Sequence, residues 1–236
     1  GSDGWSGVTA NPLLGLAVDE LVAQGGTAVL AETPEIYGAE QLLLSRVKSE
    51  SAARKLIRQV RWWEAQAELL GFSLDNNPTP GNKAGGLTTI YEKSLGAVSK
   101  GGSSPLVEVV DYAERISSPG LVFMDSPGND PVSITGQLAG GCNLIAFTTG
   151  RGSVYGSSLA PAVKIASNSA LFTRMREDMD FNAGALLEGQ SSQDAHDALG
   201  RGTAVGFLSH GHAAEAKAGN AIDILAQGDG VETGAL

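Results

Sequence analysis

The sequence predicts an α/β fold, in which helices flank a mainly parallel sheet in a Rossmann-like, three-layer arrangement. Two observations support this prediction. Short apolar runs of β type break into polar turns, and stretches with helical spacing of their apolar residues alternate with them. Such alternation is typical of parallel sheets that are covered by helices. The 236 residues are expected to form a single domain, 1–236, with a sub-boundary near residues 72–120 as the alternative.

The N-terminal part predicts a helix, a strand and a second helix. The stretch TANPLLGLAVDELVAQGG, residues 9–26, has a wide apolar face; we expect Asn11 to cap this helix and the final glycines to stop it. The run TAVLAETPE, residues 27–35, is of strand type. Residues 51–70 carry one apolar face and are closed by Gly71, which predicts the second helix.

Three later runs predict further strands. They are LVFMDSPGNDP, NLIAFTTGRGS and AVKIASNS, and each ends in a polar turn. Helical spacing is found at residues 131–140, 170–177, 191–200 and 212–227. The last of these helices is predicted from periodicity alone.

Charge and composition exclude several classes of protein. The formal net charge is −10 at pH 7 and the pI is about 4.7, so the long-range field should repel nucleic acid and anionic lipid. The single cysteine, Cys142, excludes an internal disulfide framework and is expected to be a buried structural thiol. The sequence shows neither a signal segment nor an apolar run of membrane-spanning length. We therefore expect a soluble, cytoplasmic protein that binds neither nucleic acid nor membranes.

Polar side chains follow the predicted strands at the points where they end. Glu32 ends one strand and Asp125 another, Thr149 and Arg151 end a third, and Asn168 follows a fourth. In open α/β sheets, ligands bind beyond the carboxyl ends of the strands. If the strands are parallel neighbours, these acids, hydroxyls and guanidinium group converge on one crevice.

The stretch DNNPTPGNKAGGLTTIYEKSLGAVSKGGSSP, residues 75–105, holds Lys83, Lys93 and Lys100 among glycines, prolines and hydroxyl residues. Paired glycines let backbone N–H groups approach a ligand, and a threonine behind them can start a helix. Lys83 would then stand beside a helix N-terminus, which suits a carboxylate or a phosphate. The alternative is a plain turn with a solvated lysine.

Other polar groups are open to two interpretations. Arg151, between two glycines, could grip a carboxylate in a bidentate manner or could pair with the acidic surface. Lys164 could contact a substrate or could be an edge-strand lysine. The acids of residues 177–180 could be hard-metal ligands or a solvated face.

Five stretches taken together carry a family resemblance. GSDGWSGVTANPLLG, LAETPEIYGAE, NNPTPGNKAGGLTTIYEKSLGAVSKGG, FMDSPGNDPVSITGQLAGGCNLIAFTTGRGS and EDMDFNAG resemble the altronate dehydratase and galactarate dehydratase family in its large C-terminal catalytic part. The likeness runs from about residue 1 to 190. It implies a hydro-lyase that eliminates water from a sugar acid to give a 2-keto-3-deoxy acid, helped by a divalent metal, Fe(II) or Mn(II). A sulfolactate sulfo-lyase of the same family is the alternative chemistry.

The resemblance and the strand-end pattern together give the expected site. Such an elimination needs a base, a cation that stabilises the enediolate and an acid for the leaving group. The expected catalytic residues are Lys83, Lys93 and Glu92. The expected substrate-binding residues are Asn82, Ser94, Thr149, Arg151, Lys164 and Asn168. Glu32 and Asp125 are the expected metal ligands.

Two departures from the family pattern affect the expected partners. Family members usually carry a Cys-Gly pair just before GSD and a small N-terminal domain, and neither precedes residue 1 here. We therefore expect a C-terminal domain that works with a missing N-terminal domain or small subunit, holds metal weakly by itself and forms a homo-oligomer. Two rival functions stay open: a non-catalytic binding or dimerisation module, and a nucleotide-binding domain, which lacks the expected GxGxxG motif.

Overall fold

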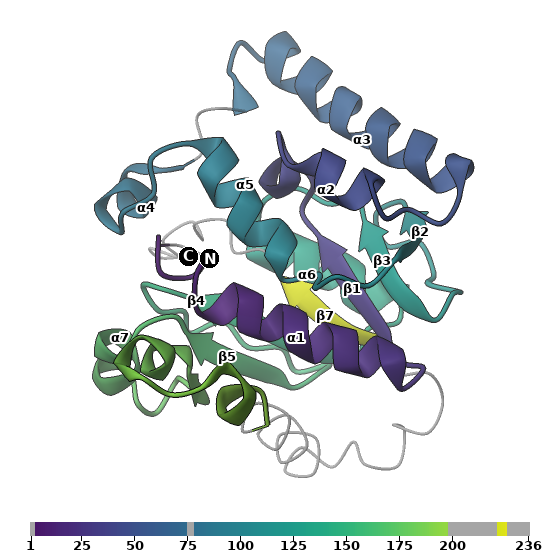
Figure 1. Ribbon diagram of the computed structural model, residues 1–236. Coiled ribbons are helices and arrows are strands. Elements are labelled where there is room, and N and C mark those ends of the chain that lie inside the picture. Colours follow the sequence, from purple (N-terminus) through teal and green to yellow (C-terminus); the bar gives the residue numbers. More distant parts are fainter. Residues whose placement is uncertain (1–2, 75–77, 198–220, 226–236) are drawn as a thin grey trace.

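A seven-stranded parallel sheet forms the centre of the computed structural model, which describes residues 3–74, 78–197 and 221–225 (Figure 1). The strand order is β2-β3-β1-β7-β4-β5-β6, and every pair of neighbours is parallel. The predicted α/β class is therefore confirmed. The strands are β1 (Thr27–Ala31), β2 (Leu106–Val110), β3 (Gly120–Met124), β4 (Leu144–Thr149), β5 (Ala162–Ala166), β6 (Phe181–Asn182) and β7 (Ala221–Leu225).

Helices form several of the connections between these strands, whereas residues 111–119 and 150–161 connect β2 to β3 and β4 to β5 without a helix. The helices are α1 (Ala10–Ala23), α2 (Glu40–Leu44), α3 (Glu50–Leu69), α4 (Pro80–Ala84), α5 (Ile90–Ser99), α6 (Asp130–Gly140) and α7 (Ser169–Arg174). Two 3₁₀ helices, η1 (Thr33–Ile36) and η3 (Ala183–Glu188), follow β1 and β6, and residues 192–197 are helical.

Alternate residues of β1 show that both faces of the sheet are covered. Ala28 and Leu30 belong to the large core that includes apolar residues of α1 and α3. Val29 and Ala31 point to the other face, where Leu138 of α6 packs against their cluster. In Figure 1, α1 accordingly crosses in front of the sheet and α6 lies behind it. The fold thus has three layers.

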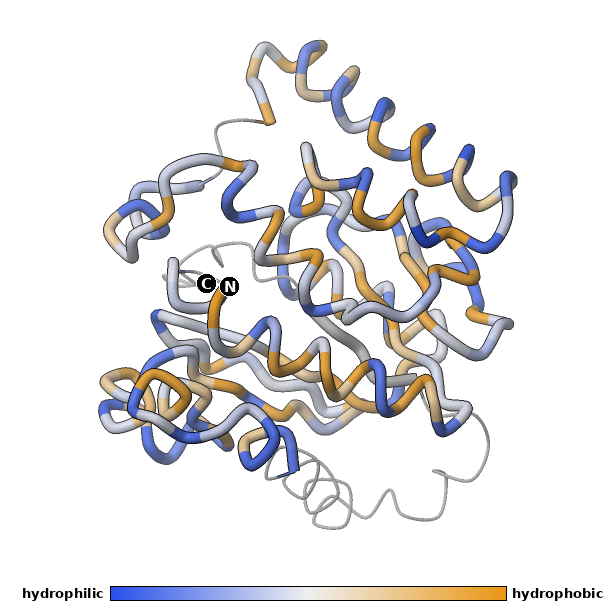
Figure 2. The backbone as a smooth tube through the Cα atoms, in the orientation of Figure 1, coloured by the Kyte–Doolittle hydropathy of each residue, from blue (hydrophilic) through white to orange (hydrophobic). Residues whose placement is uncertain are grey.

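The helix predicted at residues 51–70 is α3. The hydroxyl of Ser49 accepts a hydrogen bond from the Ala52 N–H at its start, and Gly71 follows its end with φ of 75°. Figure 2 shows hydrophilic and hydrophobic residues alternating along α3, as expected for a helix with one buried face.

The first helix has a different cap from the one predicted. Thr9, not Asn11, precedes α1, and Asn11 is the second residue of the helix and is buried. Its amide donates to the Gly96 carbonyl of α5 and accepts from the Thr148 hydroxyl of β4. The residue that looked like a cap therefore joins α1 to two other elements.

The helix predicted at residues 212–227 is wrong where the structure describes that segment. Residues 221–225 form β7, which pairs with both β1 and β4 in the middle of the sheet. The sequence AIDIL has β-branched residues at alternate positions, which fits a strand better than a helix. Two strands, β2 and β6, were not predicted either.

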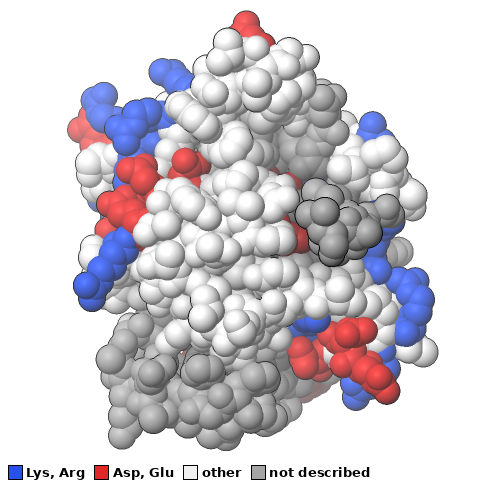
Figure 3. Space-filling view, turned by 180° about the vertical axis from the view of Figure 1, so that it is seen from behind, with Lys and Arg blue, Asp and Glu red and all other residues white. Residues whose placement is uncertain are grey.

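The described helices include none that is long and apolar enough to cross a membrane. Figure 3, seen from behind, shows basic and acidic side chains mixed around the rim of that face and a broad area without charged residues in its middle.

Candidate active site at the carboxyl edge of the sheet

The strand-end residues share one edge because all strands run in the same direction. Glu32 directly follows β1 and Asp125 directly follows β3, the neighbouring strand. Arg151 stands two residues after β4, and Asn168 two residues after β5. The carboxyl edge thus gathers these groups as the sequence predicted.

A buried ion pair lies beside this edge. The Lys93 ammonium group of α5 is 3.2 Å from a carboxylate oxygen of Glu35 in η1, and both side chains are only 1% exposed. The side-chain oxygen of Asn82 in α4 accepts a further hydrogen bond from the same nitrogen at 3.2 Å. Three elements therefore meet at Lys93, which is satisfied by one charged and one neutral acceptor.

Three more ionisable groups extend this ion pair into a cluster. Glu32 and Lys100 are fully buried and Asp130 is 4% exposed. Burial, reinforced by the negative charges of Asp130 and Glu35, raises the pKa of Glu32 well above its usual value. Burial lowers the pKa of Lys100 to about 8, although Glu32 opposes this shift. Burial and the charge of Glu35 raise the pKa of Asp130 to about 7.

The cluster can hold a mobile proton near neutral pH. We call Glu32, Glu35, Lys93, Lys100 and Asp130 the buried charge cluster. Its three acids and two lysines leave one surplus negative charge, which a single proton on a carboxyl group neutralises. Groups with pKa values near 7 and 8 are suited to general acid and base chemistry at physiological pH.

Glu32 has an unusual backbone conformation. Its φ of 71° and ψ of 78° lie in the left-handed region, which a residue with a β-carbon adopts at a cost of about 1–3 kcal/mol. Neither of its carboxylate oxygens accepts a hydrogen bond within the described part of the chain. A strained, buried carboxyl group without a hydrogen bond is a feature of functional sites rather than of stable cores.

A cavity of about 240 Å³ lies next to the cluster and shares Lys93 with it. The N-terminal segment, the start of α1 and the outer part of α5 form its walls. The charged and amide groups in its lining are Asp3, Asn11, Glu92 and Lys93. Lys93 is thus the one member of the buried charge cluster that lines this cavity.

Asp3 fixes the N-terminal segment to the carboxyl edge. Its carboxylate accepts hydrogen bonds from the Ser6 N–H and hydroxyl at 2.9 and 2.6 Å. It also accepts from the Ser167 hydroxyl at 2.9 Å and the Asn168 amide at 3.2 Å. Gly150 packs so closely against it that a β-carbon at that position would overlap the carboxylate. The loops after β4 and β5 therefore hold this acid in the cavity wall.

The structure separates the predicted catalytic residues. Lys93 belongs to the cluster, whereas Lys83 is exposed on α4 and is not brought into it. Glu92 is also exposed; its carboxylate accepts hydrogen bonds from the Thr88 N–H and hydroxyl, which lowers its pKa, and its own N–H donates to the Thr89 hydroxyl that caps α5. Glu92 still lines the cavity.

The predicted substrate-binding residues have mixed positions. Asn82 is fully buried and also forms a capping box with Thr79 at the start of α4. Ser94 is fully buried, and its hydroxyl has no hydrogen-bond partner within the described residues. Thr149 accepts from the Gly152 N–H at 2.9 Å, which shapes the loop after β4.

The other three lie toward the far half of the sheet. The Arg151 guanidinium group packs over Gly81 of α4, so this exposed side chain reaches the lysine-rich stretch. Asn168 binds Asp3 and the Gly150 carbonyl. Lys164 lies in the middle of β5, three strands from β1 in the sheet order, or about 14 Å at the usual strand spacing. It is thus not an edge-strand residue, since β6 is the edge.

The predicted metal ligands do not form a site by themselves. The Oδ1 atom of Asp125 accepts hydrogen bonds from both the Thr33 hydroxyl and the Trp63 indole N–H, so this oxygen already has two partners. No group of three His, Cys, Asp or Glu residues in the described ranges could hold a metal ion. Near Glu32, Lys93 and Lys100 offset part of the negative charge. The donor set within the described ranges therefore does not by itself fit a divalent ion.

Sequence reasoning missed four residues of the site. Glu35, Lys100, Asp130 and Asp3 were not selected, because each stands in a turn or at a helix end where a charged residue is normally solvated. One signal was available in α5, whose buried positions are Ile90, Lys93, Ser94, Ala97 and Val98. A lysine within that apolar stripe predicts a buried ammonium group.

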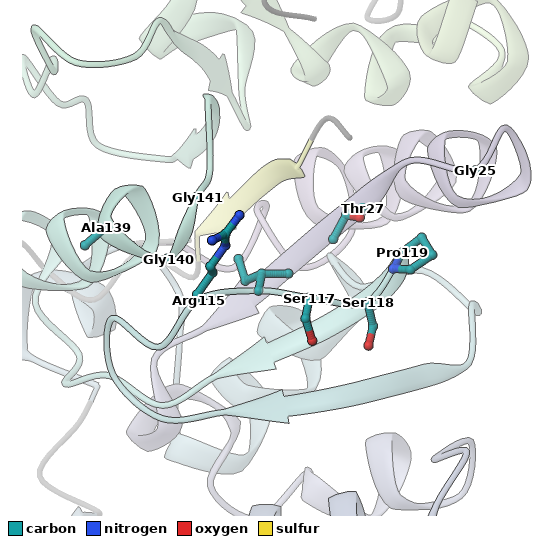
Figure 4. A pocket seen from close by; sticks show the side chains of 10 residues that line it. Gly25, Thr27, Arg115, Ser117, Ser118, Pro119, Ala139, Gly140 and Gly141 are labelled. Atoms are coloured by element: carbon teal, nitrogen blue, oxygen red, sulfur yellow. The ribbon is translucent and has the colours of Figure 1, made fainter. Parts of the chain in front are cut away.

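A larger cavity, of about 480 Å³, lies at the amino edge of the sheet (Figure 4). Thr27 at the start of β1, Arg115 and the glycines that end α6 line it. It is at the opposite end of β1 from Glu32 and contains no member of the buried charge cluster. We therefore place the candidate active site at the smaller cavity, where the ionisable groups are.

Comparison with known proteins supplies the chemical context. Residues 1–204 match the family described as D-galactarate/altronate dehydratase, C-terminal. The chain is 46% identical over 191 residues to altronate dehydratase of Escherichia coli (strain K12), covering 81% of this chain and 38% of that protein. It is 38% identical over 192 residues to galactarate dehydratase (L-threo-forming) of the same organism, covering 81% of this chain and 37% of that protein.

A relative with another activity is the beta subunit of (2R)-sulfolactate sulfo-lyase from Chromohalobacter salexigens. The identity is 36% over 202 residues, which cover 84% of this chain and 52% of that subunit. The matched region thus spans about two fifths of the length of the dehydratases and about half of the sulfo-lyase subunit.

Proposed function

Because this chain belongs to the D-galactarate/altronate dehydratase C-terminal family, we propose that the whole protein is a hydro-lyase that converts a sugar acid into a 2-keto-3-deoxy acid. The observation that carries the proposal is the buried charge cluster, which shares Lys93 with a cavity at the carboxyl edge. A binding or nucleotide-reading module has no need for such groups.

The elimination requires three tasks. The Cα–H bond breaks, its electron pair forms the Cα–Cβ double bond, and the Cβ–OH bond breaks so that the hydroxyl leaves as water. The resulting enol then tautomerises to the 2-keto acid. A base must take the α-proton, a cation must stabilise the charge that develops on the carboxylate, and an acid must protonate the leaving hydroxyl.

The cluster offers one group for each task. Lys93, on the cavity wall, is the cation that pairs with the substrate carboxylate. Lys100, with a pKa of about 8, has enough neutral amine at pH 7 to accept the α-proton through a bridging water. Glu32, whose pKa is raised by burial, holds the proton for the leaving hydroxyl and passes it through a bridging water, because Glu32 itself does not line the cavity.

The charges of the cavity favour a substrate with a single carboxylate. Asp3 and Glu92 place two carboxylates in its lining, against the one ammonium group of Lys93. A dianion such as galactarate or sulfolactate would bring its second negative charge close to these acids, and like charges in a partly desolvated site repel strongly. We therefore propose an aldonate of the altronate type as the substrate.

The metal and the partners stay predictions. Fe(II) or Mn(II) would need ligands beyond the described residues of this chain, and none of the steps above depends on the ion. The additional length of the relatives supports the prediction of an N-terminal domain or a separate small subunit. The homo-oligomer and the cytoplasmic location also stay predictions.

The test is a comparison of substrates with the complete protein. Altronate, galactarate and sulfolactate are each incubated with and without Mn(II) or Fe(II), and 2-keto acid and sulfite are measured. We expect kcat/KM for altronate to exceed that for galactarate by about tenfold or more, the effect of one unpaired charge. Equal kcat/KM values for altronate and galactarate would contradict the charge argument for an aldonate substrate but not the hydro-lyase proposal. The absence of any keto acid, under every metal condition, would overturn the hydro-lyase proposal.

A further inference from the structure

A chain of buried polar side chains connects α6 with the backbone of Glu32. The Gln137 amide donates to the Ser133 hydroxyl at 2.9 Å, and the hydroxyls of Ser133 and Ser126 are 2.8 Å apart. The Glu32 N–H then donates to the Ser126 hydroxyl at 3.0 Å. The links come from the core side of α6, from the loop after β3 and from the end of β1.

These residues occupy positions where apolar side chains would normally be found. Ser133 and Gln137 are fully buried on the same face of α6 as Ile134, and Ser126 is 1% exposed. Burying hydroxyl and amide groups costs free energy unless each is hydrogen-bonded. Here each of these side chains is hydrogen-bonded to the next one, and the last of them, Ser126, is bonded to the backbone N–H of Glu32.

That end point is the strained residue of the cluster. Glu32 adopts the left-handed conformation, and Ser126 contacts the backbone on both sides of it. Its hydroxyl accepts from the Glu32 N–H, and its carbonyl accepts from the Thr33 N–H at 3.0 Å. A strained conformation persists only when its surroundings determine it more strongly than the local preference opposes it.

We propose that Ser126, Ser133 and Gln137 form a positioning network that holds Glu32 in its left-handed conformation and so keeps its carboxyl group beside Lys100 and Asp130. None of the three contacts the cavity, so they are positioning residues that act through Glu32. The inference rests on the proposed function, because Glu32 is the proton donor there. Without the network, Glu32 relaxes toward an extended conformation and its carboxyl group leaves the cluster.

A double-mutant cycle on the complete protein tests the network. Ser126→Ala removes the hydroxyl that contacts Glu32, and Glu32→Gln removes the group that is to be positioned. We expect Ser126→Ala alone to lower kcat about tenfold with KM changed less than twofold, and to lower kcat less than twofold further in the Glu32→Gln background. Such non-additivity shows that the serine acts through Glu32.

The opposite result is equally clear. An equal loss from Ser126→Ala in both backgrounds would show a general structural effect and would overturn the proposal. If Glu32→Gln turns over at the wild-type rate, Glu32 is not the proton donor, and the proposal that the network positions it for catalysis is overturned. Thr135→Ala is the matched control, because this exposed hydroxyl on the same helix donates only to the Pro131 carbonyl; it should leave kcat and KM unchanged.

A crystal structure decides the cases in which kinetic measurements give no answer. If Glu32→Gln is too slow to measure, or if the wild type dehydrates no sugar acid, a crystal structure of Ser126→Ala shows whether Glu32 has left the left-handed region. An unchanged Glu32 overturns the network whatever the reaction is. If Ser126→Ala does not fold, Ser133→Ala removes the next link of the same chain and is assayed in its place.

Discussion

The ammonium nitrogen of Lys93 lies 3.2 Å from the carboxylate of Glu35, and solvent reaches only 1% of either side chain. Two charges so deeply buried depend on each other, because neither can be solvated if its partner is lost. Lys93 comes from a helix more than fifty residues after Glu35, so the pair also fixes α5 against the end of β1. Replacing both members of the pair therefore separates the role of Lys93 in catalysis from its effect on the stability of the fold.

Replacement of Lys93 is expected to abolish catalysis. Lys93→Met should lower kcat/KM by about a hundredfold or more, since it removes the cation for the substrate carboxylate. It should also lower the free energy of unfolding by about 3–5 kcal/mol, because the buried Glu35 carboxylate loses the ammonium group of its ion pair. The double variant Lys93→Met/Glu35→Gln should recover most of this stability but no activity. Lys83→Met, on exposed α4, is the control and should stay within twofold of the wild type. A comparable loss in both lysine variants would contradict the assignment.

The pH dependence of kcat/KM should be bell-shaped with a maximum near about pH 7.5. Activity falls at low pH because the Lys100 amine, with a pKa of about 8, becomes protonated and cannot act as the base. It falls at high pH because the carboxyl groups of the cluster lose the proton that the leaving hydroxyl needs. The pKa of Asp130, about 7, indicates the pH range in which these carboxyl groups lose protons. Because the groups interact, the two limbs report values of the cluster rather than of single residues. A flat profile from about pH 6 to 9 would exclude the cluster from the rate-limiting proton transfers.

Asp130→Asn should stabilise the protein at high pH and not at low pH. The pKa of Asp130 is raised in the folded protein to about 7 from 3.8, so the folded state binds more protons between these values. Stability therefore falls as pH rises from about 4 to 7, and removal of the acid abolishes that loss. The gain is on the order of a few kcal/mol at pH 8 and near zero at pH 4 in urea unfolding. The exposed Asp178→Asn should differ from the wild type by less than about 0.5 kcal/mol at both pH values.

Gly150→Ala should displace Asp3 from the cavity wall. A β-carbon at position 150 would overlap the Asp3 carboxylate, which is held by hydrogen bonds and cannot move aside freely. We expect a loss of about 1–3 kcal/mol in the free energy of unfolding and a higher KM. Gly156→Ala is the control, since nothing lies within 4 Å of a β-carbon there. Unchanged stability and KM in Gly150→Ala would show that the N-terminal segment is loosely attached.

The fold could be predicted from the sequence more fully than the site, for a physical reason. Periodicity reports which face of an element is buried, and it identified α3, β1, β3, β4 and β5. It cannot report which turns are covered by other elements. Lys83 and Lys100 stand in similar glycine-rich surroundings, yet one is exposed and the other fully buried, because tertiary packing decides. Lys93 is intermediate, since its position in the apolar stripe of α5 is itself a sign of burial.

The position of β7 has a consequence for how this chain is made. Strands β1 and β4 do not pair with each other; each pairs with β7, so residues 221–225 join two three-stranded halves of the sheet. While the ribosome is still translating the preceding residues, both halves present an open central edge, and open edges attract other chains. The last of the seven strands to be made closes the middle of the sheet. Synthesis that stops before residue 221 therefore leaves two half-sheets prone to aggregation, not a slightly shortened domain.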